Sequence, residues 1–171
     1  ETNENIMTGE GHRDWIQVLI STRQGLTSSL VAQTAALKFG LYGKLDCSHF
    51  LERGDGAYLE GKFHDTGDFV LTADGAGAVK LFDLHAVKMR QQYRSHTDSV
   101  NGLAFQPFTN FFVTGSADKT LSIWDMRTGL TVQTFYGHMN TINDCQFSIG
   151  GQYIASCDAD GIVKIWDIRT V

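Results

Sequence analysis

The feature of this 171-residue chain that most constrains its fold is a period of 42 residues in its second half. Trp124-Asp125 and Trp166-Asp167 lie 42 residues apart, and so do His96 and His138. The same offset joins Val100 with Ile142, Asn101 with Asn143, Phe105 with Phe147, Thr114 with Ser156, and Asp118 with Asp160. Agreement at this many positions predicts structural repeats, in which one supersecondary unit recurs along the chain.

Within one repeat the sequence predicts short strands separated by turns. The predicted strands are Ser99–Phe105, Phe111–Ser116 and Thr120–Asp125, with turn-forming Pro, Asn and Asp residues between them. Strands of about 5–6 residues with closely spaced turns indicate an all-β chain. One small sheet cannot cover both of its own faces, so we expect the repeats to stack around an axis.

Composition excludes several classes of function. The chain has 42% hydrophobic and 19% charged residues, which favours a globular fold. Its net charge is −5 and it has no run of Lys or Arg, so we expect no nucleic acid partner. No apolar stretch approaches the roughly 20 residues that span a bilayer, and the N-terminus lacks the features of a signal peptide. Three unpatterned cysteines, Cys47, Cys145 and Cys157, favour a reducing, cytoplasmic environment.

Gly137-His138 followed by Trp166-Asp167, at this period, resembles the WD40 repeat. The resemblance implies a WD40 β-propeller fragment of about four blades, each a four-stranded antiparallel sheet, cut from a larger propeller. It also implies two structural hydrogen-bonded tetrads, His96, Thr114, Asp118, Trp124 and His138, Ser156, Asp160, Trp166. A set that recurs in each repeat, inside the sheet stack, does not fit a catalytic site, so we expect no enzymatic activity.

The repeat pattern weakens towards the N-terminus. Gly11-His12 keeps the register, but the pattern is lost over 17–61 and returns at Lys62-Phe63. Two explanations stay open: compensating reading-frame shifts near Gln17 and Lys62, or genuine divergence with a helical insert around Leu30–Phe39. We therefore divide the chain into three parts. Residues 1–11 are an outer strand (Asn3–Met7) or a tail, residues 12–61 are a degenerate or frame-shifted region, and residues 62–171 are the WD-repeat blades.

Among the WD-repeat blades, 95–136 and 137–171 are sound and 62–94 is damaged. The tetrad positions of the damaged blade read Gly54, Thr72, Ala76 and Phe82, so only the hydroxyl is retained. Asp74 lies two residues away from the position expected for the tetrad aspartate.

On the family pattern, the residues that face a partner follow the histidine and precede the tetrad aspartate: Asp98, Ala117, Met139, Asn140 and Ala159. We expect no cofactor and no metal. Cys47-Ser48-His49 has no second ligand pair at zinc spacing, and Asp158-Ala159-Asp160-Gly161 lacks the remaining ligands of a calcium loop.

A narrower resemblance covers 95–171. The segments SADKTLSIWD, YGHMNTIND and ASCDADG resemble the C-terminal propeller of an axonemal central-apparatus protein of the WD-repeat family. This implies a non-catalytic scaffold in the cytoskeleton of cilia or flagella, with central-apparatus or microtubule-associated proteins as partners. A ubiquitin-ligase substrate receptor or trafficking subunit stays open as an alternative, as does a propeller enzyme, although no convergent acids or metal ligands favour it.

Overall fold

The computed structural model describes residues 58–86 and 88–169 and, as backbone only, 16–21, 27–32, 36–41 and 49–53. Every regular element in these ranges is a β-strand, and none of these residues forms a helix able to cross a membrane. The strands form four sheets in which chain neighbours pair antiparallel. The all-β prediction is confirmed.

Each of the first three sheets has four strands. The first holds β1 (Ile16–Ser21), β2 (Thr27–Ala32), β3 (Ala36–Leu41) and β4 (His49–Arg53). The second holds β5 (Tyr58–Phe63), β6 (Phe69–Asp74), β7 (Ala78–Asp83) and β8 (Lys88–Arg94). The third holds β9 (Val100–Phe105), β10 (Phe111–Ser116), β11 (Thr120–Asp125) and β12 (Thr131–Tyr136). The fourth holds β13 (Ile142–Phe147), β14 (Tyr153–Asp158) and β15 (Val163–Asp167).

The 42-residue period extends through the backbone of all four sheets. Their first strands begin 42 residues apart, at Ile16, Tyr58, Val100 and Ile142, and each pairing has a register irregularity at that starting residue. A β-bulge at the same place increases the local twist in the same way in every sheet. The helical insert predicted around Leu30–Phe39 is therefore wrong, because Leu30–Ala32 belong to β2 and Ala36–Phe39 belong to β3.

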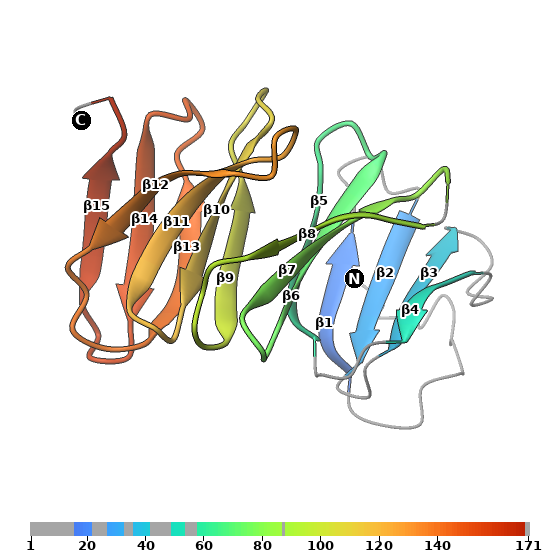
Figure 1. The fold of residues 1–171 in the computed structure, drawn as a ribbon, viewed down its shortest axis with the longest axis horizontal. Helices are drawn as coiled ribbons and strands as arrows, with labels where there is room; N and C mark the ends of the chain where they lie inside the picture. Colours follow the sequence, from blue (N-terminus) through green and yellow to red (C-terminus); the bar gives the residue numbers. More distant parts are fainter. Residues whose placement is uncertain are drawn as a thin grey trace, which may run out of the picture.

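The four sheets follow one another side by side in chain order (Figure 1). Their first strands are neighbours, since β5 contacts β1 and β9, and β9 contacts β13. The fourth strands β4, β8 and β12 lie at the far margin of their sheets. This is the arrangement of propeller blades around an axis. The predicted outer strand Asn3–Met7 lies outside the described residues.

Apolar side chains fill the space between the second and third sheets. Leu71, Leu81, Val100 and Leu103 belong to one buried cluster that joins the two sheets. The outer strand β8 contributes Tyr93, whose ring centroid lies 5.0 Å from that of Phe112 and 5.7 Å from that of Trp124. The Tyr93 hydroxyl also donates to the Met126 carbonyl at 3.0 Å. An outer-strand aromatic thus fastens one sheet to the next.

The third and fourth sheets meet in the same way. Phe135 on β12 takes the place of Tyr93, with its ring centroid 5.3 Å from that of Trp166. At the inner strands the backbones approach closely, because a Cβ on Gly102 would come within 2.7 Å of the Cys145 nitrogen. Asn101 adds a bond from Nδ2 to the Ile142 carbonyl at 3.0 Å. The inter-sheet contact is therefore itself a repeated unit.

Replacing Tyr93 tests how strongly this contact holds the fold. We expect Tyr93→Ala to lower the unfolding free energy by about 3–5 kcal/mol, as for other buried aromatics. Tyr93→Phe loses only the hydrogen bond, about 1 kcal/mol. Urea unfolding measures both, with Val132→Ala on the exposed face of β12 as a control within about 0.5 kcal/mol of the parent. A Tyr93→Ala variant as stable as this control would contradict the packing role.

Candidate functional site

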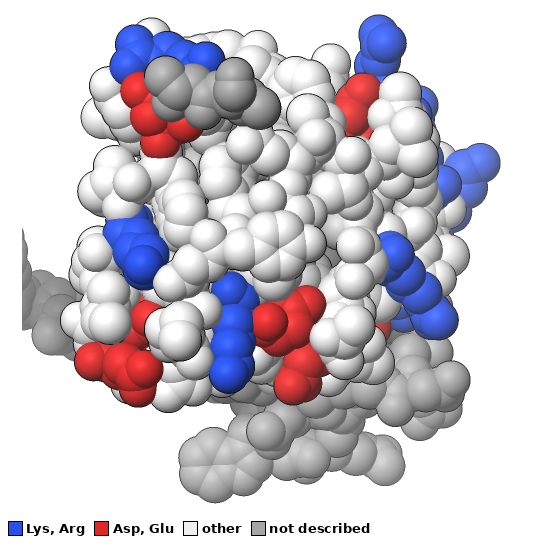
Figure 2. Space-filling view, turned by 60° about the vertical axis from the view of Figure 1, so that its left-hand side comes forward, with Lys and Arg blue, Asp and Glu red and all other residues white. Residues whose placement is uncertain are grey.

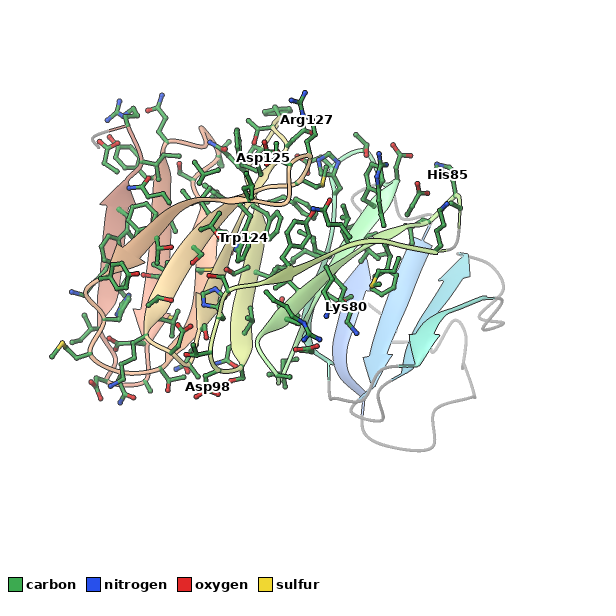
Figure 3. All side chains as sticks on the ribbon, viewed as in Figure 1. Lys80, His85, Asp98, Trp124, Asp125 and Arg127 are labelled. Carbon is green, nitrogen blue, oxygen red and sulfur yellow. The ribbon has the colours of Figure 1, made fainter. Side chains whose placement is uncertain are left out.

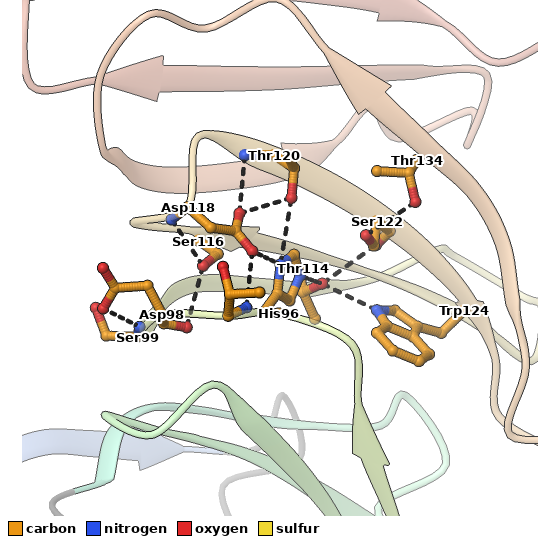
Figure 4. Close-up of polar contacts among 11 residues, drawn as sticks. His96, Asp98, Ser99, Thr114, Ser116, Asp118, Thr120, Ser122, Trp124 and Thr134 are labelled. Carbon is orange, nitrogen blue, oxygen red and sulfur yellow. Dashed lines mark hydrogen bonds and ion pairs between the residues drawn. The ribbon is translucent and has the colours of Figure 1, made fainter.

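The third sheet and its loops hold a hydrogen-bonded tetrad of His96, Thr114, Asp118 and Trp124 (Figure 4). All of its members except the half-buried Asp118 are buried. The His96 ring joins two partners, with Nδ1 2.8 Å from the Asp118 Oδ2 and Nε2 2.6 Å from the Thr114 Oγ1. The Trp124 indole donates to the same hydroxyl at 2.9 Å. The structure therefore brings together the four residues that the repeat pattern placed in this set.

The fourth sheet has an equivalent tetrad with one different member. His138 Nε2 lies 2.7 Å from the Ser156 Oγ, which also accepts the Trp166 indole N–H at 2.9 Å. The His138 Nδ1, however, lies 2.7 Å from Oδ2 of Asp158. The prediction of Asp160 as the tetrad aspartate is wrong.

Asp158 reaches the histidine because it is the last residue of β14, directly beside the turn. Its Oδ1 accepts the backbone N–H groups of Asp160 at 3.1 Å and Ile162 at 3.0 Å, while Oδ2 is left for His138. Asp160 is exposed and accepts the Asn140 amide at 2.7 Å. In the third sheet the equivalent of Asp158 is Ser116, so there the carboxylate comes from the turn residue Asp118.

The second sheet keeps more of this arrangement than its sequence indicated. Asp74 stands 84 residues before Asp158 and makes the same turn contacts, with Oδ1 accepting from Ala76 at 3.0 Å and Ala78 at 2.8 Å. The offset between the two aspartates was the signal for Asp158 that the sequence reading missed. Thr72, the equivalent of Thr114, is buried, and among the described residues its hydroxyl has no partner. Phe82 occupies the tryptophan position and offers no N–H.

Burial and charge give these sets a structural role. The hydrogen bond from His138 lowers the pKa of Asp158. Burial acts to raise the pKa of Asp118, but bonds from Thr120 and His96 outweigh it and the pKa is lowered. The residues that carry the shared hydroxyls, Thr114 and Ser156, are buried. In the described part of the chain, no three His, Cys, Asp or Glu side chains are grouped to hold a metal.

The five residues predicted to face a partner all lie in loops above the tetrads. Asp98 and Met139 are exposed, Met139 by 77%, in the loops that precede β9 and β13. Ala159 is also exposed, whereas Ala117 and Asn140 are half-buried. Figure 3 places Asp98 at the end of the sheets opposite to Asp125 and Arg127. The predicted residues therefore share one end of the molecule, and their role in binding a partner stays a prediction.

Hydrogen bonds fix the shape of this end. The Ala117 N–H donates to the Ser99 carbonyl at 2.8 Å, and the Ala159 N–H donates to the Thr141 carbonyl at 2.9 Å. The hydrogen bond from Asn140 to Asp160 joins the same two loops as the bond from Ala159 to Thr141. The loops that carry the candidate residues are therefore held on the rigid sheets beneath them.

Equivalent threonines in two sheets give a matched test of the tetrad. Thr114→Val leaves the buried Trp124 N–H and His96 Nε2 without their oxygen, and we expect a loss of roughly 2–4 kcal/mol in unfolding free energy, since each unpaired group costs about 1–3 kcal/mol. Thr72→Val removes a hydroxyl that has no described partner, so we expect no loss, or a gain below about 1 kcal/mol. Urea unfolding compares the two, and equal effects would contradict the difference between the sheets.

A second pair of variants tests the reassigned aspartate. Asp158→Ala leaves His138 and two turn amides without an acceptor, so we expect the melting temperature to fall by several degrees. Asp160→Ala removes an exposed contact and serves as the control, with little change. Thermal unfolding followed by tryptophan fluorescence measures both. A larger loss in Asp160→Ala would restore the original assignment.

Comparison with known proteins agrees with this geometry. The family described as "WD domain, G-beta repeat" matches residues 87–125 and 129–167. No curated protein matches the chain. Among solved structures, the structure of U3-55K superposes with a TM-score of 0.86 at 18% sequence identity, over 94% of this chain and 51% of that one. The chain thus spans about half the length of that structure, and the likeness at this identity concerns the fold alone. Residues 87–125 and 129–167 therefore match the WD40 repeat, in an all-β chain whose sheets are arranged as the blades of a propeller.

Proposed function

We propose that this chain is a non-catalytic protein–protein interaction scaffold that binds its partners through the loops around Asp98 and Met139. The observation that carries the proposal is the position of these loops, which project from buried tetrads at one common end of the sheets. Loops on a rigid scaffold are the usual place for recognition, and WD40 propellers use it.

The chemistry of this end fits a peptide or a protein surface. Met139 supplies an exposed, adaptable apolar side chain, and Asp98 and Asp160 supply carboxylates. Asn140 is already ordered by its bonds to Asp160 and to the Thr141 N–H. Because these groups are held before a partner arrives, less conformational entropy is lost on binding.

We further propose that the scaffold serves the axoneme of cilia or flagella, within the central apparatus, and supports motility. The support is the resemblance of 95–171, through SADKTLSIWD, YGHMNTIND and ASCDADG, to the central-apparatus protein sperm-associated antigen sixteen. Partners would then be other central-apparatus or microtubule-associated proteins. This placement is narrower than the scaffold role and is tested separately.

Proximity labelling in ciliated cells tests the binding surface. We expect Met139→Asp to reduce the labelling of direct partners by about tenfold or more, as loss of roughly 1.4 kcal/mol or more of binding energy does. The matched control is Ile149→Asp, because Ile149 is 93% exposed in the β13–β14 loop, outside the proposed surface. If both variants label the same proteins as the parent, the loops around Met139 are not the binding surface.

Localisation of the tagged protein that carries this chain tests the ciliary assignment. We expect it along the axoneme, retained after detergent removes the membrane. Absence from the axoneme, with Met139-dependent partners elsewhere, would leave the scaffold role intact. It would favour an adaptor such as a ubiquitin-ligase receptor or trafficking subunit.

A further inference from the structure

The outer strand of the third sheet exposes apolar side chains where the outer strand of the second sheet carries charge. Leu130, just before β12, and Val132 and Tyr136 on it are 68%, 59% and 76% exposed. The residues 42 positions earlier are Lys88, Arg90 and Arg94 of β8. β12 itself, Thr131–Tyr136, contains no charged residue.

The outer edge of β12 has no pairing strand in the part of the chain that the structure describes. β12 pairs with β11 and is the last strand of its sheet. Such an edge exposes unpaired backbone N–H and C=O groups, and charged side chains are one of the usual protections against pairing with another chain. Both β8 and β12 have a register irregularity, at Arg90 and at Val132, but only β8 adds cations. The edge of β12 is therefore the less protected of the two.

The exposed face of β12 turns towards a sheet that the structure describes. Thr134 and Tyr136 alternate with Phe135, whose ring packs against Trp166 of the fourth sheet. Their face is therefore the opposite one, which turns towards the second sheet and on which the Thr134 Oγ1 lies 3.3 Å from the Ser122 Oγ. Both neighbouring sheets are present, and Tyr136 still remains 76% exposed.

We propose that β12 is a self-association edge, at which two copies of this chain pair their outer strands antiparallel about a twofold axis. Thr134 of one copy lies opposite Thr134 of the other, and in this register Val132 lies opposite Tyr136 twice. Threonine pairs and aromatic–β-branched pairs are cross-strand contacts that stabilise a sheet. A twofold axis lets the same strand serve both copies, as in most homodimers.

Charge favours a second copy as the occupant of this edge. Two β8 strands in the same register would place Arg90 opposite Arg94, and like charges in that position are destabilising. Two β12 strands bring no charge together, so β12 is complementary to itself. On the side of the molecule that the third and fourth sheets form, charged side chains lie mainly along the margins and uncharged atoms across the middle (Figure 2).

Sedimentation equilibrium of the whole chain tests the proposal. We expect a monomer–dimer equilibrium with a dissociation constant of roughly 10–100 μM, because two six-residue strands make a small interface. Val132→Arg/Tyr136→Arg gives β12 the charges that β8 carries, and we expect dimerisation to weaken about tenfold or more, since like charges then face each other twice. The matched control Met139→Arg/Ile149→Arg changes the net charge equally at exposed residues outside β12, and should dimerise as the parent does.

Hydrogen exchange locates the contact. The N–H groups of β12 that point away from β11 are open to water in the monomer, so we expect exchange over Thr131–Tyr136 to slow as the chain concentration rises. Exchange over Lys88–Arg94 should not change. Circular dichroism checks that the double-arginine variant is folded.

Three results would each overturn the proposal: a chain that stays monomeric up to about 1 mM, a double-arginine variant that dimerises as the parent does, or slowed exchange on another strand. Self-association at β12 goes beyond the proposed scaffold role and does not use the loops around Met139. Because the control alters Met139 itself, failure of this proposal leaves the loop surface untouched.

Discussion

The structure depends on the burial of each sheet face against the next sheet. A four-stranded sheet has two faces, and only a neighbour on each side removes both from water. Tyr93, Phe112 and Trp124 show how this is achieved, because an outer strand of one sheet and the inner strands of the next contribute to one aromatic cluster. Burial of each such side chain contributes about 1.5–3 kcal/mol, so a few contacts per interface stabilise the stack.

The tetrads add a polar constraint inside this apolar frame. A histidine bonded on both sides, to a carboxylate and to a hydroxyl, ties the loop before the first strand to the second strand of its sheet. The second sheet keeps only part of this constraint. Asp74 still orders its turn, but Phe82 replaces an indole, and the Thr72 hydroxyl has no partner among the residues that the structure describes.

The proposed binding function depends on the residues that the stacked sheets leave exposed to solvent. Thr114 and Ser156 are buried, and the Ser/Thr–His–Asp sets hold the loops beside them in place. The loops around Asp98 and Met139 are held in place and face solvent at one end.

The sequence by itself determined the period, the strands and most of the tetrad members. Phe111–Ser116 and Thr120–Asp125 are strands with the predicted bounds, and the first predicted strand differs by one residue, because turn residues and alternating apolar positions are local signals. The tertiary structure decided between Asp158 and Asp160, because the sequence offers a repeat offset for each of them, to Asp74 and to Asp118, and only the folded turn shows which carboxylate points to His138. It also showed strands at Thr27–Ala32 and Ala36–Leu41, where the side-chain pattern was lost, and it gave Tyr93 its role. Those features depend on contacts between segments far apart in the chain, which no local pattern encodes.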